Sequence, residues 1–235
     1  GRSAIFAFIM NTQTNNIKRY GIIAGVATLA LQHAVYLLAH FISIHTGIEP
    51  FSPKLAIDDL IPIVPIFIIP YIWSYAYWAM APMAVSKCEK SHYQRYMSAY
   101  ILAMLVGGVI LIFAPTYMDR VAEGLKDPDI PGFGAHLMQF WYSLDGGDMA
   151  YNLLPSFHCL NSTMAYLGVA GRKEIPTWYR VYSLVITLLI YAATVFVKQH
   201  FILDVFSGIA VALLCWFVAG KLNLGRFFKW TTPER

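Results

Sequence analysis

Six long apolar stretches limit what this chain can fold into more than any other feature of its sequence. A helix needs about 20 consecutive apolar residues to cross the hydrocarbon core of a bilayer. We therefore predict an all-α fold, a polytopic six-helix transmembrane bundle. Its spans are expected near residues 21–44, 60–82, 97–118, 156–171, 180–198 and 202–220.

Composition supports a membrane protein. Hydrophobic residues make up 58% of the 235 residues, and charged residues make up 13%. A soluble domain carries about 25% charged residues. The net charge of +4 comes from scattered basic residues rather than from a basic face, so we expect no nucleic-acid partner.

The loop charges predict an orientation. With the N-terminus in the cytoplasm, only four of the 17 basic residues lie on the outer side, namely Lys54, Arg120, Lys126 and Lys198. Cytoplasmic loops carry an excess of Lys and Arg, so this orientation is favoured and both termini are predicted to be cytoplasmic. The expected organisation is a cytoplasmic segment over 1–20, a membrane domain over 21–220 and a basic tail over 221–235. We expect residues 1–9, which precede Met10, to be a cloning remnant.

The longest connection, near residues 119–155, is predicted on the outer face. Within it, five large apolar residues recur at helical spacing: Phe133, Leu137, Phe140, Trp141 and Leu144. This pattern predicts a short amphipathic helix. Two placements are open for it, on the outer leaflet or as a cap on the bundle.

Polar residues at the edges of the spans are the candidate functional residues, since such groups are costly in a membrane. Ser156 and His158 open the fourth span, Lys198 closes the fifth, and His200 and Asp204 open the sixth. The predicted topology places all five near the outer surface. Two helix N-termini, a lysine and a serine there suit an anion such as phosphate.

The spacing of His200 and Asp204 indicates a chemistry. Residues i and i+4 share a helix face, so the carboxylate can fix the imidazole tautomer and leave the other nitrogen as a nucleophile. His158 could then protonate the leaving group as a general acid. Each residue also has a structural interpretation: a solvated histidine, a helix-start aspartate and a snorkelling lysine.

These motifs resemble a known family. PSFH, over residues 155–158, is similar to the second signature of the type 2 phosphatidic acid phosphatase superfamily, P-S-G-H, and KQHFILD, over 198–204, is similar to the end of the third, S-R-x5-H-x3-D. The resemblance implies that His200 is the nucleophile, that Asp204 orients it and that His158 is the general acid. It further implies that Ser156 and the backbone amides of Phe157 and His158 hold phosphate oxygens.

Two departures from the family pattern concern its cationic residues. The Ser-Arg pair of the third signature falls at Ala193 and Thr194, so Lys198 is expected to replace that arginine. The first signature, K-x6-R-P, is not intact, and Arg120 is its nearest relic, with Phe113 at the lysine position. The His-aromatic-x-x-Asp form is similar to the phosphotransferase branch that includes inositol phosphorylceramide and sphingomyelin synthases.

The expected function is a lipid phosphatase of the plasma (inner) membrane, acting at the extracytoplasmic face through a phosphohistidine. The alternatives are a lipid phosphotransferase and a non-catalytic phospholipid-binding or transport protein. No metal-ligand spacing is evident, and we expect no cofactor. Three further groups are interpreted structurally: His33, His40 and His45 as packing or interfacial residues, the DGGD run 145–148 as a flexible turn, and the aromatic residues of the second span as packing.

Overall fold

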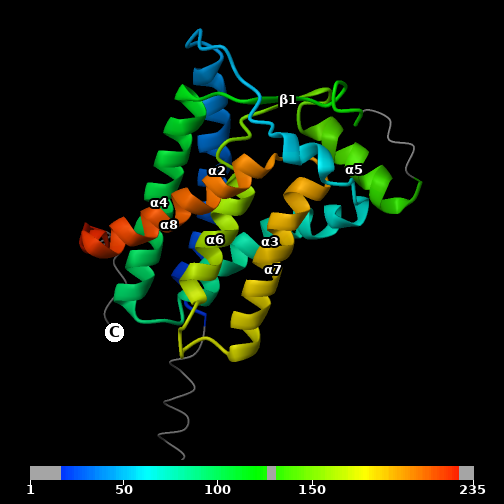
Figure 1. The fold of residues 1–235 in the computed structure, drawn as a ribbon. Helices are drawn as coiled ribbons and strands as arrows, with labels where there is room; N and C mark the ends of the chain where they lie inside the picture. Colours follow the sequence, from blue (N-terminus) through cyan, green and yellow to red (C-terminus); the bar gives the residue numbers. More distant parts are fainter. Residues whose placement is uncertain (1–16, 126–130, 228–235) are drawn as a thin grey trace, which may run out of the picture.

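The fold was obtained as a computed structural model, which describes residues 17–125 and 131–227. Helices dominate it, and Figure 1 shows the longer ones arranged as a bundle. They are α2 (Arg19–Ser43), α3 (Ile68–Val85), α4 (Lys90–Phe113), α6 (Phe157–Val169), α7 (Thr177–Phe196) and α8 (Ile202–Lys221). The predicted segment 1–20 and tail 221–235 lie largely outside the described residues, as do four of the charges used for the orientation: Arg2, Lys126, Lys229 and Arg235.

Each of the six predicted stretches contains a helix, but the helices are not equivalent. Four of them, α2, α4, α7 and α8, are long and apolar enough to cross a membrane. Helix α6 has 13 residues, a length of about 20 Å, whereas the hydrocarbon core is about 30 Å thick. It is the buried centre of the bundle and contacts α3, α4, α7 and α8. The chain is therefore a helical protein with membrane-type helices, while the count of six spans stays a prediction.

Prolines explain why α3 begins later than the predicted span. The stretch expected from residue 60 first forms two short 3-10 helices, η1 (Ala56–Leu60) and η2 (Pro65–Phe67). Proline lacks an amide donor, so it is tolerated at the first turn of a helix but not easily within it. The α-helix accordingly starts at Ile68 and contains Pro82 near its end.

The long connection between α4 and α6 contains structure that the all-α prediction missed. Strand β1 (Tyr117–Asp119) pairs antiparallel with β2 (Met149–Tyr151), with Met118 opposite Ala150. The hydrogen bonds between the two strands satisfy backbone N–H and C=O groups in segments that are not helical. They also hold the two ends of the connection together. Figure 1 shows β1 and α5 at one end of the bundle, where α4 ends and α6 begins.

Helix α5 (Phe133–Leu144) lies within that connection, where an amphipathic helix was predicted. Its buried residues, Ala135 and Met138 among them, face the bundle, and the helix contacts α3 and η2. It therefore caps the bundle. Phe133, Phe140 and Leu144 on the other face are more than half exposed. Contact of that face with a membrane leaflet stays a prediction.

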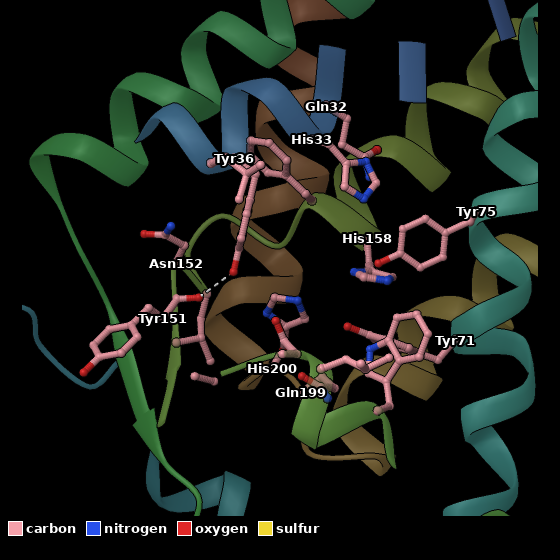
Figure 2. A pocket seen from close by; sticks show the side chains of 17 residues that line it. Gln32, His33, Tyr36, Tyr71, Tyr75, Tyr151, Asn152, His158, Gln199 and His200 are labelled. Atoms are coloured by element: carbon pink, nitrogen blue, oxygen red, sulfur yellow. Dashed lines mark hydrogen bonds between the residues drawn. The ribbon is translucent and has the colours of Figure 1, made fainter. Parts of the chain in front are cut away.

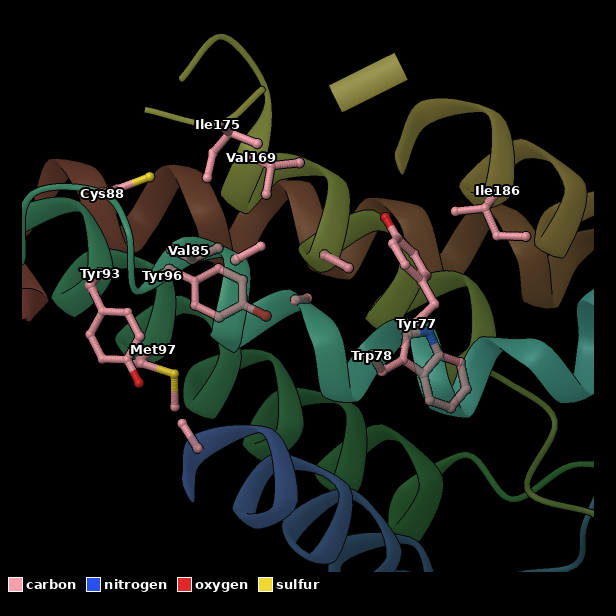
Figure 3. Close-up of a cluster of buried hydrophobic side chains, with 14 of the residues drawn as sticks. Tyr77, Trp78, Val85, Cys88, Tyr93, Tyr96, Met97, Val169, Ile175 and Ile186 are labelled. Atoms are coloured by element: carbon pink, nitrogen blue, oxygen red, sulfur yellow. The ribbon is translucent and has the colours of Figure 1, made fainter. Parts of the chain in front are cut away.

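Aromatic residues of α3 hold the bundle together, as their packing interpretation predicted. Figure 3 shows Tyr77 and Trp78 in a cluster of buried side chains. The Trp78 indole N–H donates to Ser162 Oγ of α6 at 2.9 Å. The Tyr77 hydroxyl lies 2.6 Å from Ser183 Oγ of α7. These bonds satisfy the polar ends of the buried rings and fix α3 against its neighbours.

Candidate active site

A cavity of about 470 Å³ is lined by side chains from several elements, including α2, α3, α5 and α6. His158 and His200 both line it, so the structure brings together two histidines that are distant in sequence. Figure 2 shows the two rings in the middle of the pocket. Much of the remaining wall is aromatic, with contributions from Tyr36, Tyr71, Tyr75, Trp141 and Phe157.

His158 lies in the first turn of α6 and is 8% exposed. Its ring stacks on Tyr71, with centroids 4.0 Å apart and an interplanar angle of 18°. The edge of Trp78 packs against it at 4.9 Å. Its Nε2 atom is buried and has no hydrogen-bond partner within residues 17–125 and 131–227. The ring is thus held in place by packing, while one nitrogen stays available for chemistry.

His200 sits in the turn between α7 and α8. The carbonyl of Thr194 accepts the backbone amides of both Gln199 and His200 at 3.0 Å, which reverses the chain after α7. His200 Nδ1 then lies 3.4 Å from Asp204 Oδ2. This distance is longer than a well-formed N–H···O hydrogen bond of about 2.7–3.2 Å. The His200 Nδ1 atom faces the Asp204 carboxylate. A small movement of either side chain would bring the two atoms within hydrogen-bond distance.

Asp204 also stabilises the start of α8, as its interpretation as a helix-start residue predicted, while its orienting role stays a prediction. Its Oδ2 atom accepts the backbone amide of Phe201 at 2.8 Å, which is a capping interaction. The Oδ1 atom is buried and has no partner among the residues that the structure describes. The side chain is fully buried. A carboxylate fixed in this way can orient His200 without moving.

A backbone hydrogen bond joins the two segments that carry His158 and His200. The ring centroids of His158 and His200 are 6.0 Å apart, a gap that a phosphate group can bridge. The amide of Ser156 donates to the carbonyl of Asp204 at 3.0 Å. Close approach requires glycine at position 208, because a Cβ there would lie 2.4 Å from the Ser156 carbonyl oxygen.

Ser156 is the N-cap of α6, and its Oγ accepts the amide of Cys159 at 3.3 Å. The side chain is fully buried and does not line the cavity. Helices leave their first amides without intrahelical acceptors. The amides of Phe157 and His158 therefore face the start of the helix, and the Phe157 side chain lines the cavity.

Lys198 points away from the cavity. Its backbone has φ +48°, and its Nζ donates to the carbonyl of Asp58 at 2.9 Å. Burial lowers the pKa of its ammonium group. Asp58, which sequence reasoning did not single out, also accepts the amide of Ile202 at 2.8 Å and so ties η1 to the start of α8. The geometry gives Lys198 a structural partner instead of the predicted phosphate contact.

Arg120 lies directly behind the cavity wall and is 1% exposed. Its Nη1 donates to the carbonyls of Asp145 and Gly147 at 2.7 and 2.8 Å. Its Nη2 donates to Asp145 Oδ2 at 2.9 Å and to Gln199 Oε1 at 3.0 Å. The run 145–148, interpreted as a flexible turn, is thus anchored to a buried guanidinium. Arg120 does not line the cavity itself, but its partners Asp145 and Gln199 do.

Several cavity residues were not identified from the sequence as site residues. Gln199 and Asn152 each carry a buried side-chain N–H₂ without a partner in the described ranges, and both line the cavity. His33 lines it too, although it was interpreted as a packing residue. Its ring lies 5.9 Å from that of Tyr75. Only the position of Gln199 beside His200 could have drawn attention to it.

The structure is thus a membrane-type helical bundle with two histidines at one cavity and a buried aspartate beside one of them. The family model described as PAP2 superfamily matches residues 51–218. The chain belongs to this superfamily, which confirms the family resemblance. Membership indicates phosphatase-type activity on phosphate esters. The comparisons found no matching curated protein and no matching solved structure.

Proposed function

We propose that this protein is an integral membrane enzyme that hydrolyses a phosphate monoester or diphosphate of a lipid. The observation that carries the proposal is the placement of His158 and His200 across one cavity, 6.0 Å apart, with Asp204 beside His200. In this arrangement one imidazole, oriented by the carboxylate, can attack phosphorus, and the other imidazole can transfer protons.

The reaction begins at His200 Nε2. Asp204 faces Nδ1, and once the 3.4 Å contact shortens to a hydrogen bond the carboxylate holds the proton on that nitrogen, so that Nε2 keeps its lone pair. Nε2 attacks phosphorus, the bond from phosphorus to the lipid oxygen breaks, and protonated His158 gives its proton to the departing oxygen. A water molecule, deprotonated by His158, then attacks the phosphohistidine and releases phosphate. This sequence regenerates both histidines.

The walls of the cavity support a lipid as the substrate. Aromatic rings surround the histidines, and such walls suit the apolar part of a lipid next to its phosphate. Helix α5, which lines part of the cavity, exposes Phe133, Phe140 and Leu144. That face would contact the bilayer and guide lateral diffusion of a lipid toward the cavity.

A lipid phosphotransferase is the second candidate. The cavity volume of about 470 Å³ falls in the range of about 300–1,000 Å³ typical of sites that enclose whole small molecules. It therefore has room for an alcohol acceptor beside the phosphate, as in the inositol phosphorylceramide synthase-like branch. In that case the alcohol, rather than water, attacks the phosphohistidine.

The proposed location is the plasma (inner) membrane, with the cavity at the extracytoplasmic face and both termini in the cytoplasm. Charge distribution in the sequence supports this orientation. The substrate and the bilayer are the proposed partners, and the mechanism uses no cofactor. A non-catalytic phospholipid-binding or transport protein would use the same cavity without turnover.

The test is an activity assay on the purified protein in detergent, with a panel of phosphatidic acid and polyprenyl diphosphate. Free phosphate and lipid products are followed in the same samples. We expect phosphate release, lost in both His158→Ala and His200→Ala. His45→Ala is the matched control, because His45 is exposed and lies at the end of α2.

Other results of this assay separate the candidates. Transfer of a headgroup onto added ceramide or diacylglycerol, without free phosphate, would identify a transferase. Binding of phospholipid without either product, in folded protein, would favour the non-catalytic function. Activity that survives in His200→Ala would refute the phosphohistidine mechanism.

A further inference from the structure

Arg120 cannot itself bind a substrate in this structure. Its two Nη atoms donate to five acceptors: the carbonyls of Tyr142, Asp145 and Gly147, the Asp145 carboxylate and Gln199 Oε1. The remaining Nε is buried and has no partner among the described residues, but Arg120 does not line the cavity. The guanidinium is therefore committed to its protein partners, and any effect on the cavity passes through one of them.

Two partners of Arg120 line the cavity, the Asp145 carboxylate and Gln199, and Gln199 is the one that also carries hydrogen-bond donors. It lies next to His200, lines the cavity and is 3% exposed. Since Arg120 donates to Oε1, the orientation of the amide is determined and its N–H₂ group occupies the other position. Nε2 is buried without an acceptor in the part of the chain that the structure describes. Buried donors are rarely left unpaired unless a ligand or water completes them.

We propose that Gln199 is a substrate-binding residue whose Nε2 donates a hydrogen bond to an oxygen of the phosphoryl group at His200, and that Arg120 is the positioning residue that holds its amide. This inference rests on the proposed function, which places a phosphoryl group at His200. Figure 2 shows Gln199 and His200 next to each other at the pocket.

The pairing gives a neutral side chain some of the character of a cation. A guanidinium bonded to the carbonyl oxygen polarises the amide and strengthens its N–H donors, particularly in a water-poor site. Among the described residues that line the cavity there is no lysine or arginine. Gln199 would thus supply the donor for which the superfamily signature uses arginine, at a position where this chain has Thr194 inside α7.

The experiment measures binding of orthovanadate, a mimic of a transferring phosphoryl group, to the purified full chain by isothermal titration calorimetry. Gln199→Leu removes both bonds of the amide. Gln199→Glu keeps an oxygen for Arg120 and loses the donor. Gln139→Leu is the matched control, because Gln139 Nε2 donates to the Leu125 carbonyl and does not line the cavity.

We expect both Gln199 variants to weaken vanadate binding about tenfold or more, the size of a lost hydrogen bond to a charged group. The control should bind as the unchanged protein does. Thermal unfolding of Gln199→Glu should be unchanged, which a purely structural role of the donor would not predict. If Gln199→Leu does not fold, the isosteric Glu variant decides.

Unchanged vanadate affinity in a folded Gln199 variant would overturn the inference, and so would a lack of vanadate binding by the unchanged protein. Lipid turnover, measured on the same preparations, tests the proposed function separately. Turnover without an effect of Gln199 on binding refutes only the inference. Gln199-dependent binding without turnover refutes only the catalytic proposal.

Discussion

The backbone amide of Ser156 donates a 3.0 Å hydrogen bond to the carbonyl of Asp204 and joins the first turns of α6 and α8. His158 follows Ser156 by two residues, and His200 precedes Asp204 by four. This hydrogen bond therefore helps to hold together the two segments that carry the candidate catalytic histidines. The proposed chemistry depends on a backbone contact as much as on the side chains themselves.

Gly208→Ala tests this contact. The added methyl group would lie 2.4 Å from the Ser156 carbonyl oxygen and 3.2 Å from Cys159 Cβ, so α8 must move away from α6. Overpacking of this kind costs about 1–3 kcal/mol. We expect kcat to fall sharply as the histidines separate. Gly220→Ala, on the same helix, is the control, since its methyl group meets only the flexible side chain of Arg95.

The proposed general acid can be tested with the leaving group. His158→Ala should lower kcat on a lipid phosphate by about 10²–10⁴, the usual contribution of acid–base catalysis. The loss should be much smaller on p-nitrophenyl phosphate, because a phenolate departs without a proton. His200→Ala should abolish both reactions. Equal losses of His158→Ala on the two substrates would contradict its role as an acid.

The proposed orienting role of Asp204 is separable from its capping role. In Asp204→Asn the amide oxygen can still accept the Phe201 amide and preserve the start of α8. The negative charge beside His200 Nδ1 is lost, and kcat should fall by about 10²–10⁴ with little change in the melting temperature. Asp59→Asn, at an exposed carboxylate paired with Lys54, should leave kcat unchanged. A large loss of stability in Asp204→Asn would make the residue structural.

Lys198→Met tests whether Lys198 binds the phosphate, as the sequence predicted, or only the Asp58 carbonyl, as in the structure. The ammonium group bonds to the Asp58 carbonyl and does not line the cavity. We therefore expect KM for the lipid phosphate to change by no more than about threefold, the effect of a half-exposed polar contact. A tenfold rise in KM, with the melting temperature unchanged, would restore Lys198 as a phosphate-binding residue.

Arg120→Met should destabilise the protein by about 3 kcal/mol, because it leaves the buried acceptors around it without a donor. Thermal unfolding in detergent measures this loss. Arg19→Met serves as the control, since Arg19 is exposed in the first turn of α2. Equal stability of the two variants would show that the buried network contributes nothing.

Local patterns in the sequence predicted most of the secondary structure and the central part of the site. The expected sixth span, 202–220, differs from α8 by one residue, because apolar periodicity and the capping aspartate are both local signals. His200 and Asp204 lie side by side as their spacing predicted, although the turn before α8 brings them together and not a shared helix face. The superfamily also followed from the motifs around His158 and His200.

Prediction was less successful where partners are distant in sequence. The pairing of β1 with β2 and the burial of α6 at the centre of the bundle were not anticipated, since neither depends on a local pattern. Lys198 was expected at the phosphate because it lies two residues from His200, but a left-handed backbone turns it toward Asp58. Long flexible side chains follow their packing environment rather than their place in a motif.

The sequence by itself determined that this is a helical membrane-type protein with paired histidines, because hydropathy and residue spacing act over one or two helical turns. Only the tertiary structure decided which groups surround those histidines. It placed Gln199 at the cavity and Arg120 behind it, and it turned Lys198 away. The reason is physical: a buried polar group takes the partner that packing brings within hydrogen-bond distance.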